Sequence, residues 1–223
     1  MDKELEGRGL SFVRYADDIS IYARSETAAR RILSSVTRYI ERKLLLKVNP
    51  KKTRLSRPED SNLLGFCFRK PKGGSQQWTI VIARDSIVRV KAKCKEITRR
   101  NKAYSLEERI SKLNQLLIGW VNYFLIARDY PPLDQLDGTV RFRLRMCIWK
   151  DWKTPRTRMQ RLLRLGANRR SAAGHGHSYK SYHRIVNGWT VKMALSNEYF
   201  QKNGYIGFRN HRYHQTGKQK SLF

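Results

Sequence analysis

Two adjacent aspartates lie between two short runs of β-branched and aromatic residues near the start of the chain. The runs cover residues 11–15 and 19–23, and Asp17 and Asp18 lie between them. Such residues favour strands and Asp favours turns, so the stretch predicts an antiparallel hairpin with both acids at its turn. Carboxylate oxygens suit Mg²⁺, which makes the hairpin a candidate metal site; an ordinary Asp-Asp turn is the alternative.

The charge of the chain limits its partners. The 223 residues include 47 Lys and Arg against 18 Asp and Glu, a net charge of +29. A compact domain with this charge repels itself unless polyanions neutralise it, so nucleic acid is the expected partner. An anionic membrane surface is the alternative, but no apolar run approaches the roughly 20 residues of a spanning helix. Aromatic residues make up 11%, which argues against general disorder.

Neither the cysteines nor the histidines predict a disulfide framework or a zinc site. Cys67, Cys94 and Cys147 are scattered, odd in number and without a Cys-x-x-Cys pair. We expect them to be buried small residues in a reducing, cytoplasmic environment. The five histidines of the C-terminal tail have no cysteine or carboxylate at ligand spacing, which disfavours zinc.

The first part of the chain combines two hairpins with one helix. Ser25 predicts the N-cap of a helix whose apolar face includes Leu33 and Leu44 and which ends before Pro50. Two further strands are expected at 62–68 and 78–82. The turn chemistry of residues 72–75 predicts that these two strands form a second hairpin.

From about residue 85 the apolar period changes to that of helices. Ser105 and Glu108 predict a capping box, and Thr154 followed by Pro155 predicts the start of a later helix that stops at Gly166. The expected fold class is therefore α+β, with a mixed part followed by a helical part. The expected domains are residues 1–84, residues 85–168 and a basic extension at 169–223.

Basic side chains are concentrated in the last two helices of this pattern. Between residues 139 and 170 the chain has eleven basic residues and one acid, Asp151. Charge runs are often merely solvated, but this density over two helices favours a phosphate-binding surface with a steep salt dependence. The residues assigned to nucleic-acid contact are Arg141, Arg143, Arg145, Lys150, Lys153, Arg156, Arg158 and Arg161. Trp149 and Trp152 alternate with two of them and either stack on nucleotides or cover helix ends.

Three stretches carry a resemblance to a known family. Tyr15-Ala16-Asp17-Asp18 matches the Tyr-x-Asp-Asp box of reverse transcriptases, and residues 113–124 and 147–153 resemble the maturase-specific thumb, domain X. The resemblance extends from about residue 5 to about residue 200. The chain resembles the C-terminal part of a group II intron-encoded reverse transcriptase/maturase. This implies a partial palm of antiparallel hairpins with a helix, followed by a helical thumb.

The resemblance also implies roles for individual residues. Asp17 and Asp18 would hold catalytic Mg²⁺, and Tyr15 would contact nucleic acid. Lys52, within Asn-Pro-Lys-Lys-Thr, would lie near the phosphates of the incoming nucleotide; a solvated turn lysine is the alternative. Gly65, within Leu-Gly-Phe, would help to hold the primer end, unless the segment is a plain edge hairpin.

The family activity is RNA-templated DNA synthesis together with assistance to intron splicing. Its first catalytic Asp and its fingers have no counterpart in the chain, so Mg²⁺ binding would be weak and the chain alone is expected not to polymerise. The implied partners are group II intron RNA, an RNA template with a DNA primer, and an upstream reverse-transcriptase half. A stand-alone RNA-binding maturase module and a non-functional remnant of a mobile element are the alternatives.

Overall fold

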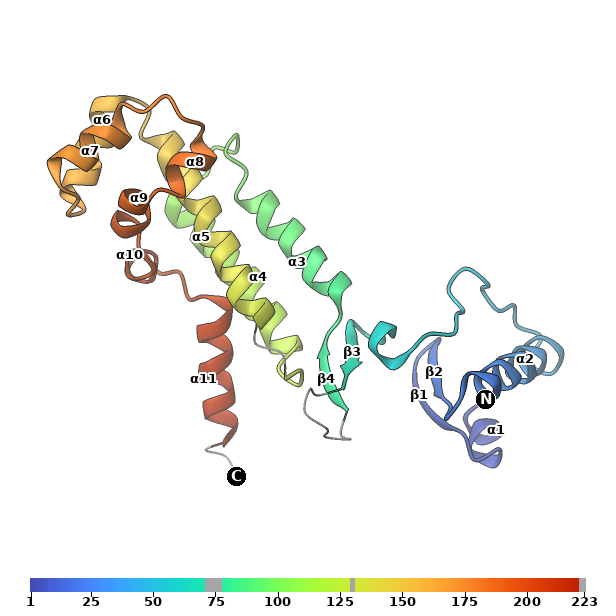
Figure 1. The fold of residues 1–223 in the computed structure, drawn as a ribbon. Helices are drawn as coiled ribbons and strands as arrows, with labels where there is room; N and C mark the ends of the chain where they lie inside the picture. Colours follow the sequence, from blue (N-terminus) through green and yellow to red (C-terminus); the bar gives the residue numbers. More distant parts are fainter. Residues whose placement is uncertain (71–77, 129–130, 221–223) are drawn as a thin grey trace. The chain divides into compact units, whose positions relative to one another are not determined.

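The computed structural model describes residues 1–70, 78–128 and 131–220, and the chain divides into two compact units (Figure 1). The units are Met1–Thr79 and Ile80–Phe223. The predicted α+β class is confirmed, since two antiparallel hairpins precede a series of helices. The turn predicted at 72–75 lies outside the described residues.

The first unit is built around the aspartate hairpin. Leu5 is fully buried where the first helix meets the first strand, and Val36 is the other buried aliphatic side chain of this unit within its described residues. The predicted antiparallel pairing is confirmed. The elements are α1 (Asp2–Gly7), β1 (Ser11–Tyr15), β2 (Asp18–Tyr22), α2 (Glu26–Arg42), the 3-10 helix η1 (Pro58–Asp60) and β3 (Phe66–Arg69).

Helix α2 begins as predicted and ends early. The Ser25 hydroxyl accepts a hydrogen bond from the amide of Ala28 at 3.2 Å, which confirms the N-cap. The helix ends at Arg42 rather than just before Pro50 because the chain turns at Leu45, whose φ is +55°. The amide of Leu46 then bonds back to the carbonyl of Ile40, a typical helix-terminating pattern. Leu44 therefore lies beyond the helix.

The strand predicted at 62–68 is partly wrong. Leu64 and Gly65 both have positive φ, +54° and +84°, and form a two-residue turn. Leu63 and Phe66, on either side of it, exchange backbone hydrogen bonds of 2.9 and 3.1 Å. The strand begins only at Phe66, because glycine accommodates the left-handed backbone of a tight turn. β3 and β4 (Thr79–Ile82) form the second hairpin.

Three long helices form the core of the second unit. They are α3 (Arg84–Ile97), α4 (Leu106–Tyr123) and α5 (Pro131–Asp151), and each packs on the other two. Their facing side chains are at most 2% exposed: Val90, Cys94, Leu113, Leu117, Val140, Leu144 and Cys147. The capping box at the start of α4 is confirmed. Burial raises the pKa of Cys94 to about 12, so this thiol behaves as the expected buried residue.

The C-terminal tail folds with this core. α6 packs on α7, α8 packs on α5, and α11 lies against both α4 and α5 (Figure 1). Residues 169–220 therefore belong to the second compact unit rather than trailing from it. The elements are α6 (Pro155–Arg164), α7 (Arg169–Gly176), α8 (Tyr182–Val186), α9 (Trp189–Ala194), α10 (Asn197–Lys202) and α11 (Phe208–Lys220).

A buried carboxylate holds the start of α11. Asp137 of α5 is 4% exposed and accepts hydrogen bonds from the hydroxyl of Tyr205 at 2.7 Å and the amides of Phe208 and Arg209 at 2.9 and 3.1 Å. The two amides belong to the first turn of α11, where helix N–H groups have no partner within the helix. Asp137 therefore caps α11 from a neighbouring helix.

Helix α4 supplies the other polar contacts to the tail. Asn114 donates to the carbonyl of Gly204 at 2.7 Å and accepts from the amide of Ile206 at 3.2 Å. In return, the buried guanidinium of Arg212 donates to the carbonyls of Phe124, Leu125 and Ala127 at the end of α4. α11 is thus held by side chains that satisfy backbone groups, which hydrophobic periodicity cannot reveal.

Tyr205 gives the second unit a specific sensitivity to alkaline pH. Burial, and then the nearby Asp137 carboxylate, raises the pKa of this phenol well above its ordinary value. The folded state therefore favours the neutral phenol, and that contribution is present below the unfolded pKa of about 10 and lost as the pH rises above it. Between pH 8 and pH 11, the difference in unfolding free energy between wild type and Tyr205→Phe should narrow by about 1.4 kcal/mol.

Urea titrations at the two pH values measure this difference. Tyr179→Phe is the control, because this side chain is fully exposed. The prediction would be contradicted if the difference in unfolding free energy between wild type and Tyr205→Phe changed with pH no more than the difference for Tyr179→Phe.

Candidate active-site hairpin and nucleic-acid interface

The β1–β2 hairpin turns through two residues only. Tyr15 pairs with Asp18 at the end of the ladder, so Ala16 and Asp17 form the turn and Asp18 is the first residue of β2. Ala16 has a φ of +52°, a left-handed conformation that non-glycine residues adopt only when their surroundings require it. The tight turn brings Tyr15, Asp17 and Asp18 together, all exposed to solvent.

The two acids have no side-chain partner in the part of the chain that the structure describes. Within the described residues, neither Asp17 nor Asp18 makes a side-chain hydrogen bond or ion pair, and the adjacent Arg14 pairs instead with Asp2 at 2.7 Å. Their carboxylates are the hard oxygen donors that Mg²⁺ prefers. The described part of the chain contains no cluster of three or more His, Cys, Asp or Glu side chains that could hold a metal. The hairpin therefore fits Mg²⁺ in ligand type but supplies only two carboxylates.

Lys52 and Gly65 lie on two separate turns of the first unit. Lys52 lies in a turn that begins at Asn49. The carbonyl of Asn49 accepts hydrogen bonds from the amides of Lys52 and Thr53, and its side-chain oxygen accepts one from the amide of Lys51 at 3.0 Å. The Lys52 side chain is exposed, and no hydrogen bond or ion pair with another described residue occupies it. Gly65 is buried in its turn. The side-chain oxygen of Asn62 accepts a hydrogen bond from the amide of Gly65 at 3.1 Å.

Two of the predicted phosphate-binding residues cap a helix instead. Arg143 donates to the hydroxyl of Thr98 at 2.6 Å and to the carbonyls of Lys95 and Thr98. Lys150 donates to the carbonyl of Arg100 at 2.7 Å. These acceptors lie at or just beyond the C-terminus of α3, where helix carbonyls have no partner within the helix. Arg109, which sequence reasoning missed, is 2% exposed and caps the same segment.

Arg145 and Arg158 also have internal roles. Arg145 is 8% exposed and donates to the carbonyl of Leu195 at 2.9 Å, and burial lowers its pKa to about 10. The guanidinium of Arg158 lies 5.1 Å from the ring centre of Trp149 and donates to the carbonyl of Trp152. Trp149 is 1% exposed, so it belongs to the core rather than to a nucleotide-stacking surface. Arg145 is buried as well, so the prediction that it contacts nucleic acid at the surface is wrong.

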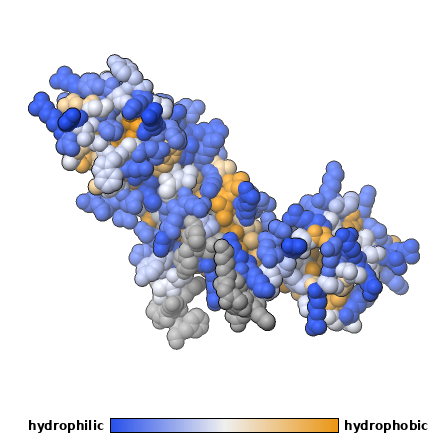
Figure 2. Space-filling model, in the orientation of Figure 1, coloured by the Kyte–Doolittle hydropathy of each residue, from blue (hydrophilic) through white to orange (hydrophobic). Residues whose placement is uncertain are grey.

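The remaining cations form one exposed group around α6 and the start of α7. The α6–α7 cationic surface consists of Lys153, Arg156, Arg161, Arg164, Arg169 and Arg170, all exposed, whose side chains make no hydrogen bond or ion pair with any described residue. No acidic residue occurs between Asp151 and Glu198. Hydrophilic side chains predominate over this end of the second unit (Figure 2). Arg141 is half-buried and lies apart from this group, lining a pocket of about 170 Å³ with Asp134 and Asp137.

Among the helices that the structure describes, none combines the length and apolar character needed to cross a bilayer.

Comparison with known families supports both halves of this picture. Residues 1–68 match the family model described as reverse transcriptase (RNA-dependent DNA polymerase), which includes the aspartate hairpin. Residues 87–166 match that of the group II intron maturase-specific domain, which includes α4, α5 and α6. A search of curated proteins found no match. The chain therefore combines reverse transcriptase sequence in its first unit with a group II intron maturase-specific domain in its second, the combination expected of a group II intron reverse transcriptase/maturase.

Proposed function

We propose that the α6–α7 cationic surface is where the maturase part of this chain binds intron RNA. The observation that carries the proposal is the contrast between two sets of cations. Arg143, Arg145, Lys150 and Arg158 are engaged with backbone carbonyls, whereas the six residues of the α6–α7 surface have no acceptor among the described residues. Folding therefore leaves these six charges available for phosphates.

The chemistry of the surface favours recognition by shape. Arginine presents several donors in a planar fork that matches phosphate geometry, and five of the six residues are arginines. In α6, Arg161 and Arg164 lie three residues apart and are both exposed, whereas Leu162 between them is buried. Structured RNA exposes phosphates and 2′-hydroxyls along its helices, so the expected contacts depend on duplex shape and the local charge density.

Neutralising two of these arginines should weaken RNA binding without unfolding the chain. For Arg161→Gln with Arg164→Gln, we expect the Kd for a folded group II intron RNA at 150 mM KCl to rise about tenfold. The plot of log K against log salt should become less steep, its slope decreasing in magnitude by about 1.5, because each lost phosphate contact reduces that slope by about 0.7–0.9. Filter binding over a salt titration measures both quantities, and circular dichroism melting checks the fold.

The matched control is Arg38→Gln with Arg42→Gln. Arg38 and Arg42 are exposed on α2 and make no ion pair within the described residues. Replacing them removes the same amount of charge, but from the first unit. Equal weakening by the two double variants would show that only total charge matters and would overturn the assignment. Equal binding of intron RNA and an unrelated duplex by the wild type would limit the surface to non-specific attachment.

We also propose that Asp17 and Asp18 are part of the catalytic metal site of the polymerase. Metal ions bound there would activate a primer hydroxyl and neutralise the charge on the leaving pyrophosphate. Within the chain, the tight turn holds both carboxylates in solvent, and Lys52 offers an ammonium that no described residue pairs with and that would balance phosphate charge. Further carboxylate would come from an upstream reverse-transcriptase half, the proposed partner of this unit.

A further inference from the structure

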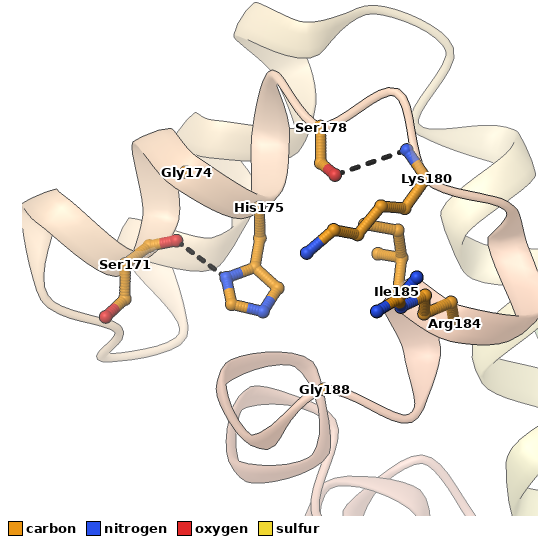
Figure 3. Close-up of a pocket in the computed structure, with 8 residues that line it drawn as sticks. All are labelled: Ser171, Gly174, His175, Ser178, Lys180, Arg184, Ile185 and Gly188. Carbon is orange, nitrogen blue, oxygen red and sulfur yellow. Dashed lines mark hydrogen bonds between the residues drawn. The ribbon is translucent and has the colours of Figure 1, made fainter.

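A second group of cations surrounds a pocket in the C-terminal tail. The pocket has a volume of about 410 Å³ and lies between α7, α8 and the start of α9, outside both segments that match known families (Figure 3). Its size falls within the range of small-molecule sites. Its polar lining includes Ser171, His175, Ser178, Lys180 and Arg184, with Gly188 at its edge.

The walls of the pocket are fixed by His175 and Gly188. The Nδ1 atom of His175 lies 2.9 Å from the carbonyl of Ser171, which can only accept, so Nδ1 carries the proton. A Cβ atom placed on Gly188 would lie 2.8 Å from the Nε2 atom of His175 and 3.0 Å from the carbonyl of Ile185. Only glycine leaves room there for the imidazole.

Two cations face this pocket without a counter-charge. The side chains of Lys180 and Arg184 make no hydrogen bond or ion pair with any described residue, and the lining contains no carboxylate. Figure 3 shows the amine of Lys180 extending between Ser178 and His175. Two positive groups beside two hydroxyls offer several donors to a single anion, an arrangement that suits phosphate.

Exposed aromatic residues lie next to the lining residues in the chain. Tyr179 separates Ser178 from Lys180 and is fully exposed, and Trp189 follows Gly188 and is 76% exposed. Large aromatic side chains left in solvent beside cations are typical of surfaces that bind unpaired nucleic acid, since bases stack on their rings.

We propose that this pocket binds a backbone phosphate of a single-stranded nucleic acid, with the neighbouring bases stacked on Tyr179 and Trp189. Lys180 and Arg184 supply the charge, and the serine hydroxyls donate to the remaining phosphate oxygens. The site shares no residue with the α6–α7 surface, although both include part of α7, so the chain would bind folded RNA and an unpaired strand through different residues.

Fluorescence anisotropy with 12-nucleotide oligo(U) and oligo(dT) tests the proposal and distinguishes RNA from DNA as the source of the phosphate. We expect Lys180→Gln with Arg184→Gln to weaken binding of the preferred strand about tenfold at 150 mM KCl, and Tyr179→Ala with Trp189→Ala to do the same. The charge-matched control is Lys93→Gln with Lys202→Gln, two exposed lysines outside the pocket, which should change Kd less than threefold.

Gly188→Ala tests the cavity without changing charge. Its Cβ would displace the imidazole of His175, so single-strand binding should fall at least fivefold while binding of duplex RNA is retained. If the Lys180/Arg184 pair and the control pair weaken binding equally, and Gly188→Ala has no effect, the pocket is not a binding site. Because the α6–α7 surface is tested with folded intron RNA and this pocket with 12-nucleotide single strands, failure of either proposal leaves the other measurable.

Discussion

Replacing Asp137 with alanine should lower the free energy of unfolding of the second unit by about 3 kcal/mol. The carboxylate accepts three hydrogen bonds, from the Tyr205 hydroxyl and from the amides of Phe208 and Arg209, and it is 4% exposed. Hydrogen bonds to a charged acceptor contribute about 1.5–3 kcal/mol each, and removing the buried charge recovers part of that loss. The variant leaves a buried phenol and the first turn of α11 without an acceptor.

Urea unfolding and limited trypsin digestion measure this effect. Arg209 and Arg212 lie in α11, so trypsin should cut there much faster once the helix detaches from α4 and α5. Asp134→Ala is the matched control: it lies one turn earlier in α5, and its ion pair with Arg209 is exposed to solvent, so little stability should be lost. Equal unfolding free energies for the two variants would contradict the proposed role of Asp137.

Local chemistry in the sequence predicted the element boundaries where capping residues set them. Ser25 caps α2, Ser105 and Glu108 form the capping box of α4, and Thr154 accepts the amide of Thr157 at the start of α6. Each signal depends on residues within one turn of each other. The aspartate hairpin was predicted for the same reason, since its pairing involves only twelve adjacent residues, from Ser11 to Tyr22.

Signals that depend on distant residues were not predictable in this way. The tail has weak apolar periodicity, and the contacts that hold it join residues about 70–90 positions apart, such as Asn114 with Gly204 and Asp137 with Phe208. The turn at Leu64 was not predicted because leucine rarely adopts a positive φ, so nothing in the residue type indicates a turn there.

Charge in the sequence did not reveal which cations would be accessible. Arg143 and Arg161 look alike in the sequence, yet one caps α3 and the other faces solvent. The useful sign would have been the absence of acids between Asp151 and Glu198, where cations have no local carboxylate to pair with. Within that stretch, nothing in the local sequence indicates that Lys180 and Arg184 line a pocket, because its walls come from three separate helices.

Asp17 and Asp18 should account for the divalent-metal binding of the first unit. We expect the chain to bind Mn²⁺, a spectroscopic substitute for Mg²⁺, weakly at the hairpin, since two carboxylates without substrate phosphates hold such an ion poorly. Asp17→Asn with Asp18→Asn should abolish this binding, because an amide keeps the size of the side chain but removes its charge. Neither acid has a partner among the described residues, so stability and RNA binding should not change.

Electron paramagnetic resonance of free Mn²⁺ measures the loss, and Glu59→Gln with Asp60→Asn is the control. These acids are also adjacent and exposed in the same unit, but they lie on η1 rather than on a two-residue hairpin turn. If both pairs bind Mn²⁺ equally, the hairpin has no special geometry for the metal. Primer extension on poly(rA)/oligo(dT) gives the second measurement. Two carboxylates fall short of a two-ion centre, so robust synthesis by this chain alone would contradict the need for an upstream half.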